Sequence, residues 1–192
     1  MPVNPDRFEI VISGSGGQGA ILAGRILAEA AALYDGKEAV MAQSYGPEAR
    51  GGASRAEVVI SKQKIHYPKV MSVDILLVMT QEAMDKYGAL LSPDGLLIAD
   101  EIFVKEIPPD LKHVFKAPFS QHARKLLGVP IVSNIVALGA LASITKVISR
   151  NALIHTVLGL VSKKVLVINR IAIDTGFKIA QESGFQWEKK RG

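Results

Sequence analysis

Runs of apolar residues alternate with segments of helical periodicity through the first two thirds of the chain. Short runs rich in Val and Ile predict buried strands, whereas apolar positions spaced three or four residues apart predict helices. The expected strands are residues 8–13, 38–44, 55–61, 74–80, 96–99 and 113–116, and the expected helices between them are residues 20–33, 81–91 and 120–127. A turn is expected at Pro93, Asp94 and Gly95.

This alternation predicts an α/β fold with three layers, α/β/α, around a mixed, largely parallel sheet. The first strand, the glycine-rich turn and the first helix predict a Rossmann-like first βαβ unit. Residues 134–148, 152–161 and 164–183 all show helical spacing, so we expect a helical C-terminal part. Without a linker or repeat in the sequence, we expect a single domain over residues 1–192. The charged tail, residues 188–192, is expected to be mobile.

The last expected helix carries more apolar residues than one core-facing stripe needs. Val165, Val167, Ile168, Ile171 and Ile173 are examples. For each residue alone, burial in the core is the better expectation, but some of the set are predicted to face a partner.

A glycine-rich segment links the first expected strand to the first expected helix. It matches the pattern G-x-G-x-x-G with Gly14, Ser15, Gly16, Gly17, Gln18 and Gly19. Glycine at such a position allows a tight turn and a close backbone approach to a phosphate, and the helix N-terminus that follows favours an anion. The loop is therefore a candidate anion-binding site, in which Gln18 either contacts a phosphate or caps the helix. The alternative is that the glycines only form the turn.

Nicotinamide-dinucleotide enzymes with this pattern also need an acidic residue at the end of the second strand, where it binds the ribose hydroxyls. Residues 41–44 contain no Asp or Glu, and Asp35 precedes the strand in a turn, where it is better interpreted as a helix-end residue. An ordinary NAD dehydrogenase is therefore disfavoured. A stand-alone Rossmann-like nucleotide-binding enzyme remains an alternative.

A second glycine-rich loop follows the second expected strand. It contains Tyr45, Arg50, Gly51 and Gly52, and Arg55 follows at the start of the next strand. Arginine binds phosphate and carboxylate groups through two parallel hydrogen bonds, so we include these five residues in the candidate cofactor-binding site. Alternatively, Arg50 ties the loop together through backbone carbonyls, and Tyr45 packs rather than orienting a substrate.

Composition narrows the chemistry that this chain can perform. It contains no cysteine, which excludes iron–sulfur clusters, thiolate zinc sites, disulfides and cysteine nucleophiles within it. The four histidines have no neighbours at metal-ligand spacing and are interpreted as ordinary surface or core residues; they are His66, His113, His122 and His155. No sequence pattern marks a general base or nucleophile, so we expect neither a metal site nor a catalytic residue in this chain.

Charge and hydropathy bear on the partners. The net charge of +5 favours anionic ligands or an acidic partner. Nucleic acid is not expected, because only 6% of residues are aromatic and the basic residues are dispersed. Residues 126–145 are uncharged and match a membrane span in length, but Pro130, Ser133, Asn134 and Ser143 interrupt them. Since the first eight residues also lack an apolar stretch, a cytoplasmic protein without membrane contact is expected.

The two loops together resemble those of the gamma subunit of 2-oxoacid:ferredoxin oxidoreductases. The resemblance rests on the glycine loop, on Tyr45-Gly46-Pro47-Glu48 followed by Arg50-Gly51-Gly52, and on Asn134 with Leu138-Gly139-Ala140. It covers roughly residues 8–184. Residues 45–52 are most similar to the 2-oxoglutarate type within this pyruvate/ketoisovalerate oxidoreductase gamma family. The resemblance also implies a sheet that curls more than a plain doubly wound one.

The resemblance implies an enzyme complex that converts a 2-oxoacid and coenzyme A (CoA) into an acyl-CoA and carbon dioxide and passes the electrons to ferredoxin. The family uses thiamine diphosphate, Mg and iron–sulfur clusters. This chain has no cysteine, and its Asp94-Gly95 is not followed by the paired asparagines of the thiamine diphosphate motif. These cofactors are therefore expected on partner alpha, beta and ferredoxin-like delta subunits.

The resemblance gives the gamma subunit itself a non-redox role. We expect it to be inactive alone, and either to help bind CoA as the co-substrate or to close the active site of the complex. A purely structural assembly subunit is the other alternative.

Overall fold

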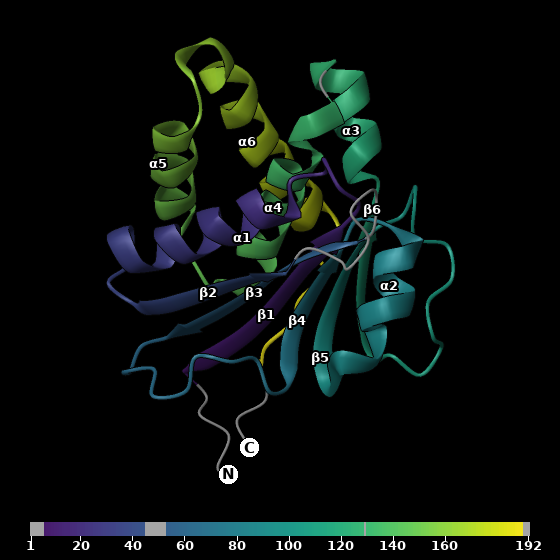
Figure 1. Ribbon diagram of the computed structural model, residues 1–192. Coiled ribbons are helices and arrows are strands. Elements are labelled where there is room, and N and C mark those ends of the chain that lie inside the picture. The colour runs from purple at the N-terminus through teal and green to yellow at the C-terminus, as the bar shows by residue number, and fades with distance from the viewer. Residues whose placement is uncertain (1–5, 45–52, 129, 190–192) are drawn as a thin grey trace.

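The computed structural model describes residues 6–44, 53–128 and 130–189. Within these ranges, six strands form one sheet in the order β2-β3-β1-β4-β5-β6. The strands are β1 (Arg7–Gly14), β2 (Glu38–Ser44), β3 (Ser54–Ser61), β4 (Val73–Val78), β5 (Leu91–Asp100) and β6 (His113–Ala117). All six expected strands are confirmed, and Figure 1 shows the sheet that they form.

The sheet is mixed, with one strand running against the others. β1, β4, β5 and β6 pair in parallel, whereas β3 pairs antiparallel with both β1 and β2. β3 therefore separates β1 from β2, although the expected order of strand, helix and strand is present. The expected α/β class with a largely parallel sheet is confirmed.

Helices cover both faces of the sheet (Figure 1). One face carries α1 (Ala20–Glu29), its π-helical continuation (Ala30–Tyr34), α4 (Ser133–Thr145), α5 (Arg150–Leu160) and α6 (Leu166–Glu182). The other face carries α2 (Gln81–Tyr87), and α3 (Phe119–Leu127) follows β6. Short 3-10 turns are formed by Gly88–Leu90, Pro130–Val132 and Lys163–Val165. The three helices after residue 132 form the expected helical C-terminal part.

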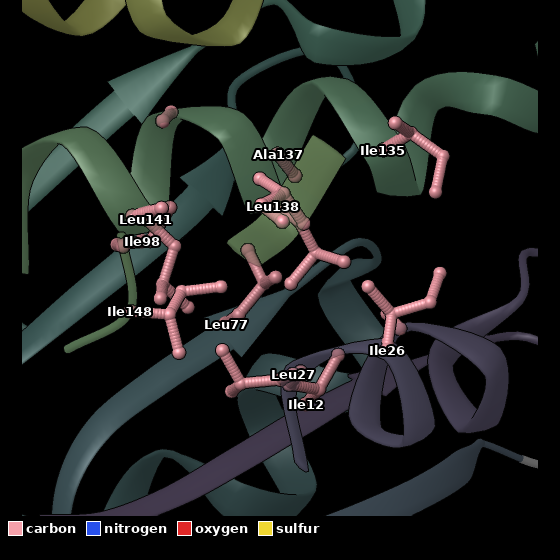
Figure 2. Packing of buried hydrophobic residues seen from close by; sticks show 14 of the residues in the cluster. Ile12, Ile26, Leu27, Leu77, Ile98, Ile135, Ala137, Leu138, Leu141 and Ile148 are labelled. Carbon is pink, nitrogen blue, oxygen red and sulfur yellow. The ribbon is translucent and has the colours of Figure 1, made fainter. Parts of the chain in front are cut away.

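The core consists of two layers because successive strand residues point to opposite faces. Ile12 and Leu77 belong to the layer under α1 and α4, and Figure 2 shows them near Leu27 and Leu138 of those helices. On the opposite face, Val11 and its neighbours pack against α2. Full burial of each such side chain contributes about 1.5–3 kcal/mol, so the layers rather than the loops hold the fold together.

α4 and α6 cross at two glycines. A Cβ atom at Gly139 would lie 2.5 Å from the backbone oxygen of Ile173, and one at Gly176 would lie 2.8 Å from the backbone nitrogen of Ala140. Real Cβ atoms do not approach backbone so closely, and the two helices can therefore touch only because both residues lack a side chain. This crossing fixes the position of α4.

The outward face of α6 is partly apolar. Val167 is 74% exposed and Ile171 is 45% exposed, whereas Ile173 is fully buried. The expectation of burial in the core is confirmed for Ile173 and is wrong for Val165, Val167 and Ile171, which are exposed. Their contact with a partner stays a prediction.

The prediction of a turn at residues 93–95 is wrong. The chain does not reverse there, because these residues lie inside β5. β5 pairs with β4 through Leu91 and Val73, and then through Leu96 and Ile75. Between these two pairs β4 advances by two residues and β5 by five. The extra residues of β5 are accommodated as a bulge. The Pro-Asp-Gly sequence breaks the regular pairing without ending the strand.

The C-terminal tail is docked rather than mobile as far as Lys189. Its Nζ donates hydrogen bonds to Asp74 Oδ2 at 2.7 Å and to the backbone oxygen of Arg7 at 2.5 Å. Trp187 is 6% exposed, and its Nε1 donates to the backbone oxygen of Asp94 at 3.2 Å. The tail therefore covers the edge of the sheet where β1 and β4 begin. The rest of the expected mobile segment, residues 190–192, lies outside the described residues.

A cavity of about 740 Å³ lies at this same edge, between the tail and the end of α4. Lys37 lines it, and burial lowers the pKa of its amine, although Asp35 opposes that shift. The amine donates a hydrogen bond to the backbone oxygen of Val147 at 2.6 Å. Lys37 therefore ties the residue before β2 to the residues that follow α4.

No helix within the described ranges combines the length and apolar character needed to cross a bilayer. The uncharged residues 126–145 instead divide into the end of α3, a 3-10 turn and the buried helix α4. The hydrophobicity of α4 reflects its burial inside the protein.

Candidate functional site

The glycine loop lies at the carboxyl end of β1 and leads directly into α1. Gly17 has φ +89° and Gly19 has φ +74°, in the left-handed region that residues with side chains rarely adopt. Gly19 is also the residue that caps the N-terminus of α1, which has no side-chain cap. The predicted strand, tight loop and helix are confirmed.

The four glycines of the loop differ in what surrounds them. At Gly14 a Cβ atom would lie 2.6 Å from Gln18 Oε1, and at Gly19 it would lie 3.3 Å from Cγ of Asn134. No atom lies within 4 Å of the corresponding position at Gly16 or Gly17. Gly14 and Gly19 thus make room for other parts of this chain, whereas Gly16 and Gly17 are open to the outside.

Gln18 does not cap α1. Its Oε1 accepts a hydrogen bond from the backbone N–H of Ser15 at 2.8 Å, and its Nε2 donates to the backbone oxygen of Met79 at 3.5 Å. A contact of Gln18 with a phosphate stays a prediction.

Asn134 joins the N-termini of α1 and α4. Its Nδ2 donates to the backbone oxygen of Gly19 at 3.2 Å, and its Oδ1 accepts from the N–H of Ile135 at 2.8 Å. The residue before α4, Val132, has no side chain that can cap the helix, and neither α1 nor α4 carries an acidic residue in its first turn. The positive ends of two helix dipoles therefore meet beside the glycine loop, and no acidic residue in the first turn of either helix neutralises them.

The second loop lies largely outside the described residues. Tyr45, Arg50, Gly51 and Gly52 fall there, and their place in the site stays a prediction. The residues on either side of this loop are described, and on its C-terminal side Ser54 pairs with Gly14 at the start of the glycine loop.

Hydrogen bonds connect the end of the second loop to the end of β1. Ser13 Oγ donates to the backbone oxygen of Ser54 at 2.9 Å, and Ser54 Oγ donates to that of Gly14 at 3.2 Å. Glu82 Oε1, at the start of α2, accepts from the backbone N–H of Ala53 at 3.1 Å. Both predicted loops therefore start and end at the carboxyl edge of β1 and its neighbours.

Arg55 is engaged within the protein. Its guanidinium lies 2.5 Å from Glu57 Oε1 and stacks over the ring of Tyr87 at 5.0 Å. Its Nε is buried without a hydrogen-bond partner among the described residues. These contacts give Arg55 a structural role, and its predicted contact with a ligand is not tested by them.

The chain leaves β1 and β4 in opposite directions along the sheet. β1 leads through α1 to β2 on one side, and β4 leads through α2 to β5 on the other. Open α/β sheets bind ligands at the carboxyl ends of two neighbouring strands that diverge in this way. The glycine loop thus lies at the topological switch point of this sheet.

A pocket of about 470 Å³ opens beside the loop. It is lined by Gly17, Gln18, Ile102, Phe103, Ser120, Gln121, Arg124, Lys125, Pro130, Ile131 and Ser133. Phe103 and Ile131 give it a partly exposed apolar wall, and Arg124 and Lys125 bring two cations from the last turn of α3. Neither cation has an ion-pair partner within the described ranges.

One polar atom in the pocket wall lacks a partner. The hydroxyl of Ser120 is buried and makes no hydrogen bond to the described residues, although the backbone N–H of Ser120 donates to Asp100 Oδ2 at 2.8 Å. A buried hydroxyl without a partner normally bonds to water or to a ligand. The pocket thus combines an open glycine backbone, two cations and a free hydroxyl with apolar walls, which suits a ligand with anionic and apolar parts.

Sequence reasoning missed Arg124, Lys125 and Ser120. The sequence does show a basic pair at the end of an expected helix, a position where the helix dipole favours cations. What the sequence did not show is that this helix end lies beside the glycine loop.

Within the described part of the chain, no side chains are placed to hold an iron–sulfur cluster or a metal ion. The sequence has no cysteine, and the described residues contain no group of three or more His, Cys, Asp or Glu side chains placed to hold a metal ion. Asp35 lies near the count from the glycine loop at which NAD enzymes carry their ribose-binding acid, and it accepts hydrogen bonds from the backbone N–H and the hydroxyl of Ser149. It ties the end of the first helix to α5, as its position at a helix end predicted.

The fold and the candidate site define an α/β protein with a glycine loop and a cation-lined pocket at the carboxyl edge of its sheet. Residues 9–179 match the family model described as pyruvate ferredoxin/flavodoxin oxidoreductase. The 2-oxoglutarate synthase subunit KorC of Methanocaldococcus jannaschii is 47% identical over 178 residues, which cover 92% of this chain and 95% of that protein. The chain therefore belongs to this family, as a gamma subunit of the 2-oxoacid:ferredoxin oxidoreductases.

Two solved structures agree with this assignment. The gamma subunit of a keto/oxoacid ferredoxin oxidoreductase from Geobacter sulfurreducens is 45% identical, with a TM-score of 0.85 over 92% of this chain and 97% of that one. A 2-oxoglutarate:ferredoxin oxidoreductase from Magnetococcus marinus, solved with 2-oxoglutarate, coenzyme A and succinyl-CoA, is 26% identical, with a TM-score of 0.81. This chain is covered to 98% there but corresponds to 32% of that longer polypeptide.

Proposed function

We propose that this chain is the gamma subunit of a 2-oxoglutarate:ferredoxin oxidoreductase. The relatives that are named 2-oxoglutarate synthase subunits are 41–51% identical to it. Those named pyruvate synthase or ketoisovalerate oxidoreductase subunits are 28–35% identical. The higher identity to the first group supports 2-oxoglutarate as the substrate of the complex.

In this proposal the complex converts 2-oxoglutarate and CoA into succinyl-CoA and carbon dioxide. Two electrons pass to ferredoxin, and the proton of the CoA thiol is released. Thiamine diphosphate, Mg and iron–sulfur clusters belong to the partner alpha, beta and delta subunits, because this chain has no cysteine and its described residues contain no group of side chains placed to hold a metal ion. The gamma chain is inactive alone.

We propose further that the pocket at the carboxyl edge handles CoA. The observation that carries this proposal is the meeting of the glycine loop and the N-terminus of α4 with Arg124 and Lys125 around one apolar-walled pocket. The two cations and the open backbone of Gly17 suit the phosphate groups of CoA. Ile102, Phe103 and Ile131 offer apolar surface to its remaining parts.

Alanine substitutions of Arg124 and Lys125 test this role in the complex purified with its partner subunits. Because a hydrogen bond to a charged group contributes about 1.5–3 kcal/mol, we expect the KM for CoA to rise about tenfold to a hundredfold. The KM for 2-oxoglutarate is expected to stay unchanged. Lys178→Ala, on the exposed face of α6, is the control for loss of a surface cation.

An unchanged KM for CoA in both variants would rule out the pocket as the CoA site. If the variants instead reduced the yield of complex without changing the kinetics of the intact complex, the chain would be a structural assembly subunit. Tight binding of NAD or NADP to the isolated chain would favour the stand-alone nucleotide-binding alternative.

A further inference from the structure

Gln18 connects the two strand ends that flank the switch point. Its carboxamide accepts a hydrogen bond from the Ser15 N–H and donates one to the backbone oxygen of Met79, the residue after β4. The backbone N–H of Gln18 also donates to the backbone oxygen of Ser15 at 3.1 Å. The glycine loop is thereby closed on itself and fastened to the neighbouring strand.

The fit of this side chain depends on Gly14. A Cβ atom at residue 14 would lie 2.6 Å from Gln18 Oε1 and 3.1 Å from Cβ of Met79, so no other residue leaves room for the carboxamide. The Ser15 N–H, which could otherwise bind an anion, is used inside the loop. The open backbone positions that remain are Gly16 and Gly17, and Gly17 lines the pocket.

We propose that Gln18 is a positioning residue, which holds the glycine loop closed and presents the backbone of Gly16 and Gly17 to the pocket in one conformation. This inference rests on the proposed function, because CoA is the ligand whose binding the loop would assist. A segment of several glycines loses much conformational freedom on becoming ordered, and a loop that is already held avoids that cost when the ligand binds. Gln18 acts in this way through its hydrogen bonds to Ser15 and Met79.

Two substitutions separate the contributions of the carboxamide. Gln18→Ala removes both side-chain hydrogen bonds. Gln18→Glu keeps an acceptor for the Ser15 N–H, loses the donor to Met79 and adds a negative charge beside an anion-binding pocket. Gln63→Ala is the matched control, because Gln63 is exposed in the loop after β3 and no side-chain hydrogen bond of it is seen.

The experiment combines hydrogen exchange of the loop with kinetics, both on the complex purified with its partner subunits. In Gln18→Ala we expect exchange in the peptide that covers residues 13–22 to accelerate about tenfold, the size expected for losing about one net hydrogen bond. The KM for CoA should rise by a similar factor, with kcat at saturating CoA changed less than twofold, because only the ordering of the free loop is lost. In Gln18→Glu exchange should stay close to that of the wild type while the KM for CoA rises.

Unchanged exchange in Gln18→Ala would overturn the proposal, whatever the kinetics. A second result would also overturn the proposal: Gln18→Ala exchanges faster but leaves the KM for CoA unchanged, while Arg124→Ala raises that KM. Gln18 would then hold the loop without assisting the binding of CoA. If Arg124→Ala and Gln18→Ala both leave the KM unchanged, the proposed function fails and this inference fails with it. If Gln63→Ala raised the KM for CoA by the same factor, the proposal would also be overturned, because the effect would not depend on the position of the glutamine.

Discussion

Replacing Gly176 with alanine tests how much of the stability depends on the crossing of α4 and α6. Alanine is the better helix former by about 1 kcal/mol, so helix propensity alone predicts a gain. The new Cβ atom would stand 2.8 Å from the backbone nitrogen of Ala140 and closer still to the backbone oxygen of Val136. Both atoms belong to the backbone of α4, so a side-chain rotation cannot relieve the contact and one helix must move.

The magnitude follows from the balance of these two effects. Overpacking of a well-filled core costs about 1–3 kcal/mol when side chains can adjust, and a forced shift of backbone lies at or above the upper end of that range. After the gain in propensity we expect a net loss of about 2 kcal/mol or more. For a chain of this size such a loss lowers Tm by about 4–8 °C.

Gly159→Ala is the matched control for this substitution. Gly159 lies within α5, and no atom lies within 4 Å of its Cβ position. Propensity then acts alone, and we expect a gain of about 0.5–1 kcal/mol. Thermal and urea unfolding of the purified chain, followed by circular dichroism, measures both variants. A Gly176→Ala protein that melts at or above the wild-type temperature would refute the claim that the backbones touch at this crossing.

Two further predictions concern buried polar groups. Asn134→Ala removes two hydrogen bonds and leaves a void between the N-termini of α1 and α4. Unfolding in urea should therefore show that the free energy of unfolding falls by about 2–3 kcal/mol. The control is Asn151→Ala at an exposed position, which should change the free energy of unfolding by less than about 0.5 kcal/mol. Burial raises the pKa of Asp74 above its usual range, against the hydrogen bonds from Lys189 and from the backbone N–H of Glu9. The folded chain therefore holds this proton to a higher pH than the unfolded chain, so the contribution of Asp74 to stability is present below about pH 4 and is lost as the pH rises through the raised pKa. Urea unfolding between about pH 4 and 7 should show a shallower decline in Asp74→Asn than in the wild type, and equal slopes would contradict the assignment.

The sequence predicted β1, β4 and the second half of β5 well because each carries a run of apolar residues that is buried in the sheet. It could not predict that β3 separates β1 from β2, since strand order depends on packing between segments far apart in the chain. The turn at residues 93–95 failed for a related reason. Pro93 and Gly95 mark a local irregularity, and the pairing of β5 with β4 on either side decides that the strand continues.

The site was predictable where its chemistry is local and not where it is assembled from distant elements. The glycine pattern identified the loop, and its position before a helix gave it physical meaning. Arg124 and Lys125 resemble any basic pair on a solvated helix until α3 is placed beside the loop. Likewise, the docking of Lys189 onto Asp74 joins residues that are 115 positions apart, and no pattern in either segment indicates it.

The pattern G-x-G-x-x-G is fulfilled here for reasons different from those in dinucleotide-binding proteins. Gly14 makes room for the carboxamide of Gln18, and Gly19 makes room for Asn134 while adopting a left-handed conformation. Neither requirement involves a pyrophosphate, and β2 ends without the acidic residue that a ribose would need. The match to the pattern is therefore no evidence for a nicotinamide cofactor in this chain. The part of the loop left open is Gly16 and Gly17, and Gly17 lines the pocket that also carries two cations from α3. Ordered backbone N–H groups at a helix N-terminus favour a ligand that is partly anionic.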